Sequence, residues 1–384
     1  MKVSFLAALS GALVLITAFA VADSLPLGDG KVAGAPRVGY LYSCLTDFSG
    51  HGAAHSGPWI QGDTWTPSDK PAVQGAVSWP NSSISISLEG GKRVIRANDL
   101  PKHTTGTFPI QQSDPAYQYD HNPNSIRTQD IVLSLPADPS AAAAPGCLPM
   151  GIIGFALTGA AIFDAVDAAG RDAVAHEVQD HCNGHPQHEG QYHYHGPSPC
   201  MRDDAGAAGR HSDLIGYALD GYGIYGEHGE GGKLLHDSDL DACHGHTHAV
   251  MWDGKLQVIY HYHLTPEYPY TLGCFHGSVD PSLLQRMDTR EGQGMSSGPQ
   301  GGHAPQGRQG PHANPAALTR AADILGISAD RLRAALGPPP PDFAKAAATL
   351  GIGEDKLRDA MRKARQETEG QGDQGQGAPP SPPS

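Results

Sequence analysis

Short alternations of hydrophobic and polar residues recur along residues 23 to about 150 of this chain. They are clearest at residues 83–88, Ser-Ile-Ser-Ile-Ser-Leu, and at residues 93–96, Arg-Val-Ile-Arg. Successive side chains of a strand point to opposite faces, so a period of two predicts short β-strands. Because the chain also contains 49 Gly and 32 Pro, we expect a mainly β fold with many turns and long connections.

An internal duplication follows these strands. The aligned blocks are residues 156–163 with 218–225 (offset 62), residues 180–185 with 241–246 (offset 61), and the tetrad Tyr-His-Tyr-His at 192–195 with 260–263 (offset 68). Three blocks in the same order predict two similar halves, at about residues 150–200 and 214–277, within one β-rich domain of residues 23–287. Such halves usually pack about a pseudo-twofold axis, although a tandem duplication can also leave two independent sites.

The first 22 residues have the features of a secretory signal peptide. Met1-Lys2 precedes an apolar stretch at residues 5–20, and Ala20-Val21-Ala22 forms a small-x-small cleavage site. No later stretch supplies about 20 uninterrupted apolar residues. We therefore expect a secreted or periplasmic protein that does not associate with a membrane after cleavage; an uncleaved N-terminal anchor is the alternative.

The six cysteines all precede residue 292, at positions 44, 147, 182, 200, 243 and 274. Export favours disulfides over thiolate metal ligands. Six cysteines allow 15 pairings. The internal symmetry favours Cys182 with Cys200 and Cys243 with Cys274, which leaves Cys44 to pair with Cys147.

The charge balance argues against nucleic acid and anionic membranes as partners. The net charge is −14, with 17% charged residues, and both of those partners reward clustered Lys and Arg. Cations are the natural ligands of such a chain. Fifteen of the 21 histidines lie between His176 and His276, and histidine is the commonest metal ligand in proteins.

The two tetrads supply the principal candidate metal ligands. In a strand, His193 and His195 share one face about 6.6 Å apart at the backbone, and so do His261 and His263. Such a pair can chelate one ion, and the duplication favours a single site that all four histidines share. In the second tetrad strand the alternate residues Leu256, Val258, Tyr260, Tyr262 and Leu264 should pack on the core, with the histidines facing a cleft. The alternative is that these histidines bond to backbone carbonyls in a loop-rich domain.

Several residues near the tetrads are secondary candidates. His185 and His246 follow the two Cys-x-Gly segments and could complete the metal site. Asp180 and Asp241 could accept an imidazole N–H and orient a ligand, or they could cap a turn. We also consider Asp220 as a general base and His103 as a loop histidine that reaches the site. The remaining nearby histidines are expected to form a weakly chelating fringe; they are His181, His188, His244 and His248.

The C-terminal quarter has a different organisation. Residues 288–315 are rich in Gly, Gln and Pro and predict a disordered linker, and residues 367–384 predict a disordered tail. Between them, residues 316–366 contain an Ala-rich pattern that recurs at an offset of 25, which predicts two short helical repeats. The pattern also looks like the turn of a helix-turn-helix DNA reader, but export and the acidic balance favour a spacer or a protein-docking module.

Taken together, these motifs resemble the YHYH-domain family of exported proteins. The resemblance covers roughly residues 40–280 and rests on residues 180–195, 216–226, 241–246 and 268–277, with an upstream Asn-x-x-Pro-x-His-like element at residues 98–103. It implies a shared fold for this region. It does not imply an activity, so any functional expectation depends on the side chains.

The side chains favour an exported protein that binds a transition metal, copper or zinc, through paired imidazoles. Calcium would require many carboxylate and carbonyl oxygens. A metal-dependent extracytoplasmic hydrolase or copper oxidoreductase is one alternative, because an ion with an open position could activate water. A metal-free structural or adhesive module is the other.

Overall fold

A computed structural model describes most of the β-rich region and much of the C-terminal repeat region. The described residues are 24–45, 48, 54–201, 203, 205–284, 315–336, 343–353, 356–357, 360–361 and 363–364. The chain divides into two compact units, residues 1–298 and 299–384. The expected signal peptide and C-terminal tail, and the expected linker except for Pro315, lie outside the described residues.

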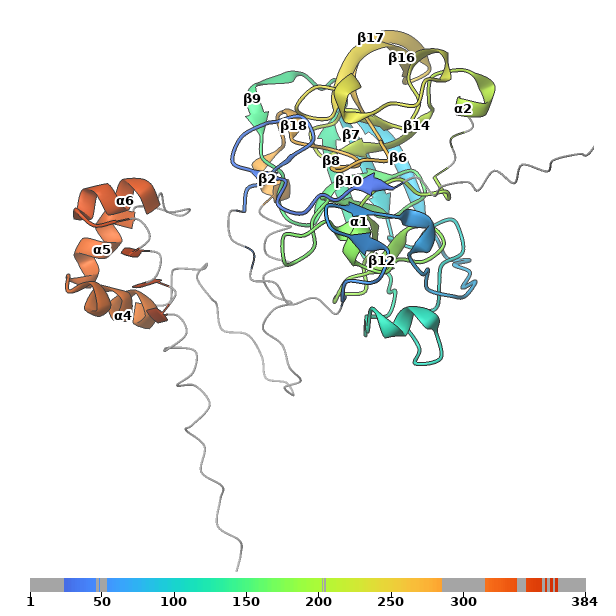
Figure 1. Cartoon of the computed structure of the whole chain (residues 1–384). Coiled ribbons are helices and arrows are strands. Elements are labelled where there is room, and N and C mark those ends of the chain that lie inside the picture. The colour runs from blue at the N-terminus through green and yellow to red at the C-terminus, as the bar shows by residue number, and fades with distance from the viewer. Residues whose placement is uncertain are drawn as a thin grey trace, which may run out of the picture. The chain divides into compact units, whose positions relative to one another are not determined.

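An eight-stranded sheet forms the centre of the first unit, with the strand order β12-β13-β11-β10-β14-β15-β17-β16. Its strands are β10 (Ile152–Ala156), β11 (Ala161–Phe163), β12 (Gly184–Pro186), β13 (Tyr192–Tyr194), β14 (Leu214–Ala218), β15 (Gly223–Tyr225), β16 (Gly245–Trp252) and β17 (Lys255–His263). In Figure 1 the β16–β17 hairpin lies at the top of this unit, and β12 lies in its lower part. The two tetrads therefore occupy opposite ends of one sheet.

The two halves of the predicted duplication have equivalent strand pairing. β10 and β14 meet antiparallel at the middle of the sheet, where Phe155 pairs with its repeat equivalent Tyr217. On each side the order of pairing is the same: an antiparallel hairpin, then a parallel contact to the tetrad strand, then an antiparallel contact to the Cys-x-Gly-His strand. The pseudo-twofold axis passes through the Phe155–Tyr217 pair.

Smaller sheets and short helices surround this sheet. The remaining strands are β1 (Leu25–Pro26), β2 (Val32–Ala33), β3 (Leu41–Tyr42), β4 (Ile60–Gln61), β5 (Thr64–Trp65), β6 (Ile84–Glu89), β7 (Lys92–Ala97), β8 (Ile131–Pro136), β9 (Ala141–Gly146) and β18 (Phe275–Gly277). The short α-helices are α1 (Ala173–His176) and α2 (Ala205–Ala208), and the 3-10 turns are η1 (Pro67–Asp69), η2 (Pro115–Gln118), η3 (Glu230–Gly232) and η4 (Asp237–Asp239). β6 and β7 pair antiparallel, so the strands predicted from the two clearest alternations are confirmed, as is the mainly β class.

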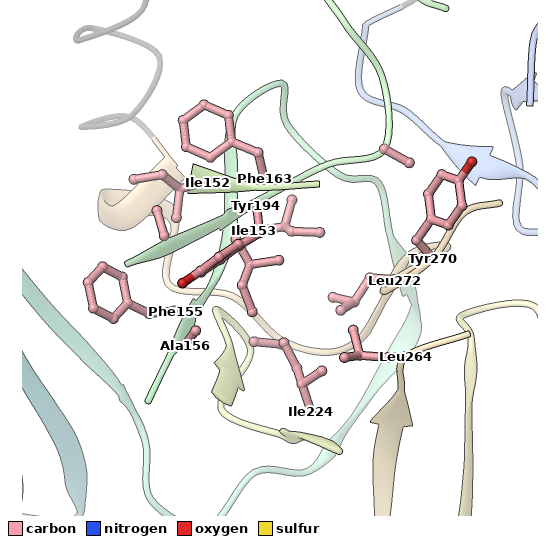
Figure 2. Close-up of a cluster of buried hydrophobic side chains, with 14 of the residues drawn as sticks. Ile152, Ile153, Phe155, Ala156, Phe163, Tyr194, Ile224, Leu264, Tyr270 and Leu272 are labelled. Atoms are coloured by element: carbon pink, nitrogen blue, oxygen red, sulfur yellow. The ribbon is translucent and has the colours of Figure 1, made fainter. Parts of the chain in front are cut away.

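The two copies share one hydrophobic core. Figure 2 shows Ile152 and Phe155 of the first copy and Ile224 of the second in one cluster of buried side chains, together with Leu264 and Leu272, which follow β17. Each of these side chains is at most 6% exposed. Burial of this apolar surface is the main force that holds the two copies together.

All three predicted disulfides are confirmed. The bonded pairs are Cys44–Cys147, Cys182–Cys200 and Cys243–Cys274. They account for all six cysteines, so no thiolate is available as a metal ligand.

The tight contact at the twofold axis makes a specific prediction. A Cβ on Gly216 would lie 2.6 Å from the carbonyl oxygen of Phe155 on the neighbouring strand. We expect Gly216→Ala to lower the free energy of unfolding by about 1–3 kcal/mol, since backbone must move to admit the methyl group. Urea unfolding followed by tryptophan fluorescence measures this, with Gly34→Ala as the control because a Cβ there meets nothing within 4 Å. Equal stabilities for the two variants would contradict the prediction.

The prediction that alternate side chains of β17 pack on the core is correct only near the tetrad. Tyr260 and Tyr262 are buried as predicted, but Leu256 is 71% and Val258 is 74% exposed. The reason is that the β16–β17 hairpin extends beyond the neighbouring strand β15, which pairs only with Tyr262 and His263. Near the hairpin tip, Asp253 accepts two hydrogen bonds from Arg93 of β7, at 2.9 and 2.8 Å.

The second unit contains the predicted helical repeats. Its helices are α4 (Pro315–Leu325), α5 (Ala329–Leu336) and α6 (Phe343–Leu350). Gly326 and Gly351, 25 residues apart, both end a helix with a positive φ, of 69° and 71°. Ser328 Oγ accepts from the Arg331 N–H at 3.3 Å, as expected of a helix N-cap. None of the helices among the described residues is long and apolar enough to cross a membrane.

Candidate metal centres

The tetrad histidines belong to two separate clusters rather than one. We call centre 1 the group His185, His193 and His195 with Glu177, and centre 2 the group His211, His246, His248, His261 and His263. Within each histidine group the potential ligand atoms lie within 4.8 Å of one another. The expected single site is wrong because four strands separate β13 from β17, which places the tetrads roughly 24 Å apart across the sheet.

Each centre contains three histidines that lie at equivalent positions of the two copies. His185 of β12 lies beside His193 of β13, and His246 of β16 lies beside His261 of β17. The third member is the last histidine of each tetrad. The Cys-x-Gly-His loops are also equivalent, since the backbone N–H of Asp180 donates to Gly184 O and that of Asp241 donates to Gly245 O, both at 2.9 Å.

Backbone hydrogen bonds fix the orientation of the tetrad imidazoles. The acceptors are Gln191 O for His193 Nδ1 (3.2 Å), Asp164 O for His195 Nδ1 (2.5 Å), Ile259 O for His261 Nδ1 (3.0 Å) and Gly226 O for His263 Nδ1 (2.6 Å). A carbonyl oxygen only accepts, so Nδ1 carries the proton in each ring. In the neutral ring Nε2 then presents a lone pair to the cluster, which is the tautomer that binds metal. The contacts with backbone carbonyls that were expected as the alternative are therefore present, and they fix the orientation of the four rings.

Centre 1 brings three imidazole nitrogens together and places a carboxylate oxygen beside two of them. The Nε2 atoms of His193 and His195 are 3.1 Å apart, and Glu177 Oε2 lies 3.3 Å from Nε2 of both His185 and His195. Ligand atoms at 2.0–2.1 Å from a tetrahedral zinc ion lie about 3.3 Å from one another. The three histidines are only 3–4% exposed, so this centre is closed to solvent.

The electrostatics of centre 1 depend on Glu177. Burial alone would raise the pKa of Glu177, but His185 and His195 lower that pKa well below its usual range. Burial lowers the pKa of His193 well below its usual value, and the neighbouring His185 and His195 lower it further. For His195, burial is outweighed by Glu177, which raises the pKa. The carboxylate is therefore ionised, and it needs a cation or a proton held between it and the imidazoles.

Glu177 comes from an element that the sequence did not single out. It directly follows helix α1, whose N-cap Asp172 accepts from the Ala175 N–H at 3.2 Å. The buried Lys70 donates from Nζ to the carbonyl oxygen of Glu177 at 2.8 Å and also to that of Val174. The duplication gave no signal for Glu177, because its equivalent at an offset of 61 is Ser238.

Centre 2 contains five imidazoles and is partly open to solvent. The Nε2 atoms of His211 and His263 are 3.2 Å apart, and those of His246 and His248 are 2.8 Å apart. His261 and His263 are fully buried, whereas the other three are half-buried. Glu230 lies at the rim, with Oε1 3.2 Å from His248 Nδ1, and the carbonyl oxygen of Ala249 lies 3.4 Å from the same nitrogen.

Four imidazoles of centre 2, those of His211, His246, His261 and His263, have lowered pKa values. Burial lowers the pKa of His261 to about 3 and that of His246 to about 4, and the neighbouring histidines add to both shifts. Burial also lowers the pKa of His211, and it lowers that of His263 well below its usual value. Protons therefore compete weakly with a metal ion at this centre.

Two members of centre 2 differ from the sequence expectation. His248 was expected in the weakly chelating fringe, but β16 continues to Trp252 and places His246 and His248 on the same face of the strand. His211 was missed. It lies just before β14, and its repeat equivalent at an offset of 62 is Pro149, so only its membership of the His-rich region could have suggested it.

Asp180 and Asp241 bind the tetrad tyrosines rather than an imidazole. Asp180 Oδ1 accepts from the Tyr192 hydroxyl at 3.0 Å, and Asp241 Oδ1 accepts from the Tyr260 hydroxyl at 3.0 Å. Each carboxylate also accepts from the N–H of the cysteine two residues later, at 2.8 and 2.9 Å. The expected imidazole contact is therefore wrong, and the turn-capping alternative describes both residues.

Asp220 and His103 also lie behind the tetrads, on the tyrosine side. Asp220 Oδ2 accepts from the Tyr262 hydroxyl at 2.5 Å, and His103 Nε2 lies 2.5 Å from the Tyr194 hydroxyl. Thr158, the repeat equivalent of Asp220, also bonds to Tyr194, at 3.0 Å. Asp220 thus has the symmetric role that its sequence did not suggest. Neither Asp220 nor His103 belongs to a centre, and nothing in these contacts supports Asp220 as a general base.

The other fringe histidines lie outside both centres. His181 and His188 are exposed, and the buried His244 has Nε2 3.0 Å from Thr265 Oγ1. Two further groups combine His103 or His181 with Cys182, but this cysteine is in a disulfide and offers no thiolate.

The family comparison agrees with the motifs. Residues 132–233 match the family described as YHYH protein, a range that contains all of centre 1 and, of centre 2, His211. No curated protein and no solved structure matches the chain. The resemblance that the motifs predicted is therefore shown for residues 132–233.

Proposed function

We propose that this protein binds transition metal ions, copper or zinc, outside the cytoplasm, at the two histidine centres. The observation that carries the proposal is the convergence of imidazole Nε2 atoms whose Nδ1 protons are already committed to backbone carbonyls. His193 and His195 are the clearest pair, with 3.1 Å between their Nε2 atoms.

Two neutral imidazoles in this arrangement cannot hydrogen-bond to each other. Both Nε2 atoms would then be acceptors, so their lone pairs repel across a buried gap unless a cation, or a proton shared with Glu177, lies between them. Turning either ring to its other tautomer would place a lone pair against a carbonyl oxygen. A metal ion removes both problems at once, because each nitrogen donates its lone pair to the ion.

The donor set restricts the metal. Imidazole nitrogen suits zinc, copper, iron and nickel, whereas calcium and magnesium require oxygen ligands. All six cysteines are in disulfides, which is typical of exported proteins and removes the softest ligands. The apolar stretch near the N-terminus supports the same location.

Metal content of the purified protein tests the proposal. We expect about two ions per chain when the protein is incubated with zinc and copper and unbound metal is then removed by desalting. We further expect that H193A/H195A and H246A/H261A/H263A each remove one ion, because the first leaves only His185 and Glu177 in centre 1 and the second leaves only His211 and His248 in centre 2. Elemental analysis by mass spectrometry measures the ratio. The control is H55A/H188A, which removes two exposed histidines outside the centres. Substoichiometric metal in the wild type, unchanged in a variant lacking all four tetrad histidines, would instead favour a metal-free polar network.

A further inference from the structure

The two centres differ in what has been added to the common three histidines. Centre 1 gains Glu177, and centre 2 gains His211 and His248. The corresponding positions of the other copy hold Ser238, Pro149 and Gln187, none of which is an ionisable ligand. The duplication therefore produced two centres of different charge, donor number and exposure.

Centre 1 has the features of a closed zinc site. It offers three imidazole nitrogens within 4.8 Å of one another and a carboxylate oxygen 3.3 Å from two of them, a donor set of the kind that four-coordinate zinc takes. The carboxylate offsets part of the charge of a divalent ion, as a deeply buried ion requires. Four protein ligands would leave no position for water. The three histidines are buried and the Glu177 side chain is only 20% exposed, so a chelator has little direct access to an ion there.

Centre 2 has the features of a copper(II) site. Five nitrogens exceed what a tetrahedral ion takes, and copper(II) prefers tetragonal nitrogen coordination. Two nitrogens about 2.0 Å from an ion and at right angles to each other lie about 2.8 Å apart. The Nε2 atoms of His246 and His248 are 2.8 Å apart. Both rings reach solvent, so a ligand from outside can contact an ion held there.

From these differences we propose that centre 1 holds zinc in a closed site, and that centre 2 holds copper(II), which exchanges with solvent. This division rests on the proposed metal-binding function. Glu177 determines the preference of centre 1 for zinc. His211 and His248 determine the preference of centre 2 for copper(II). Glu230 adds negative charge at the rim of the second centre, with Oε1 3.2 Å from His248 Nδ1.

The test uses the full-length mature chain, loaded with one equivalent each of zinc and copper(II). Metal retention after passage through a competing chelator is measured by elemental analysis, and the copper environment by electron paramagnetic resonance. We expect one zinc and one copper per wild-type chain, with copper lost at least about tenfold faster. H211A/H248A should weaken copper binding at least about tenfold, change its resonance spectrum and leave zinc unchanged. Glu177→Gln should weaken zinc by a similar factor and leave copper unchanged.

The outcomes separate this inference from the function on which it rests. A wild-type chain that binds neither metal stoichiometrically overturns both. A chain that binds two ions of either metal without preference, or a copper spectrum unchanged in H211A/H248A, keeps the proposed function and overturns the division. Far-ultraviolet circular dichroism checks that each variant is folded. If Glu177→Gln is not folded, Glu177→Asp replaces it, since the shorter carboxylate should also weaken zinc selectively. H55A/H188A is the matched control.

Discussion

Acidification from pH 6.5 to 4 should lower the free energy of unfolding of the metal-free protein by roughly 2–4 kcal/mol. The principal cause is the buried imidazole of His261 in centre 2. Burial lowers the pKa of His261 to about 3, whereas the same side chain in the unfolded chain has a pKa near 6.5. As the pH falls, the unfolded chain takes up the proton first. The stability from this group is therefore complete above pH 6.5 and is lost as the pH falls towards the folded value.

Urea unfolding at pH 4, 5, 6 and 7 measures this effect. All four tryptophans lie in the β-rich unit, so their fluorescence reports its unfolding and not that of the helical unit. The variant His261→Gln lacks the titrating ring and should show a flatter dependence on pH. The control is the same substitution at the exposed His188. Parallel pH curves for the wild type and His261→Gln would show that the buried ring is not the source.

Replacement of Asp180 by alanine should be the most damaging single substitution among the residues around the tetrads, with a loss of about 3–4 kcal/mol. This carboxylate is 1% exposed. It accepts from the Tyr192 hydroxyl and from the backbone N–H groups of Gly106 at 2.8 Å and Cys182 at 2.8 Å. Its removal leaves these buried donors without an acceptor, which costs more than the loss of the hydrogen bonds alone.

The duplication supplies a matched comparison for this substitution. Asp241 bonds to the equivalent tyrosine and cysteine, but it is exposed, so water can replace its carboxylate. Asp241→Ala should therefore cost only about 1 kcal/mol in the same urea experiment. A loss in Asp180→Ala no larger than that in Asp241→Ala would mean that burial of these bonds does not determine their contribution.

Much of the fold follows from sequence pattern because the duplication is local and ordered. The alternating residues of β6 and β7, the three disulfides and the equivalence of the two halves could all be predicted. Their prediction needs only strand periodicity, export chemistry and the alignment of one copy on the other. The helical repeats were predictable for the same reason, since Gly326 and Gly351 mark equivalent helix ends.

The composition of the centres could be predicted only in part. The shared histidines His185, His193 and His195, with their equivalents, follow from the repeat. Their division between two centres could not be predicted, because it depends on which strands form the middle of the sheet. Here β10 and β14 pair, which sends the tetrads to opposite ends.

The candidate ligands that only one copy contains could not be predicted, for a related reason. Glu177 and His211 lie on segments whose positions depend on long-range contacts, such as that of Lys70 with the residues after α1. Neither has a ligand at the equivalent position of the other copy, so the repeat offered no sign of them. Protein docking through the C-terminal helices stays a prediction, as does the exported location.

Because the two copies meet at the central Phe155–Tyr217 pair, their tetrads are far enough apart to change independently. Four strands lie between the tetrads, and the effects of substitutions separated by more than about 10 Å usually add. A chain that combines Glu177→Gln with H211A/H248A should therefore show the sum of the separate changes in binding free energy. Each copy can acquire or lose a ligand without affecting the other, so a symmetric ancestor could diverge into two specialised sites one substitution at a time.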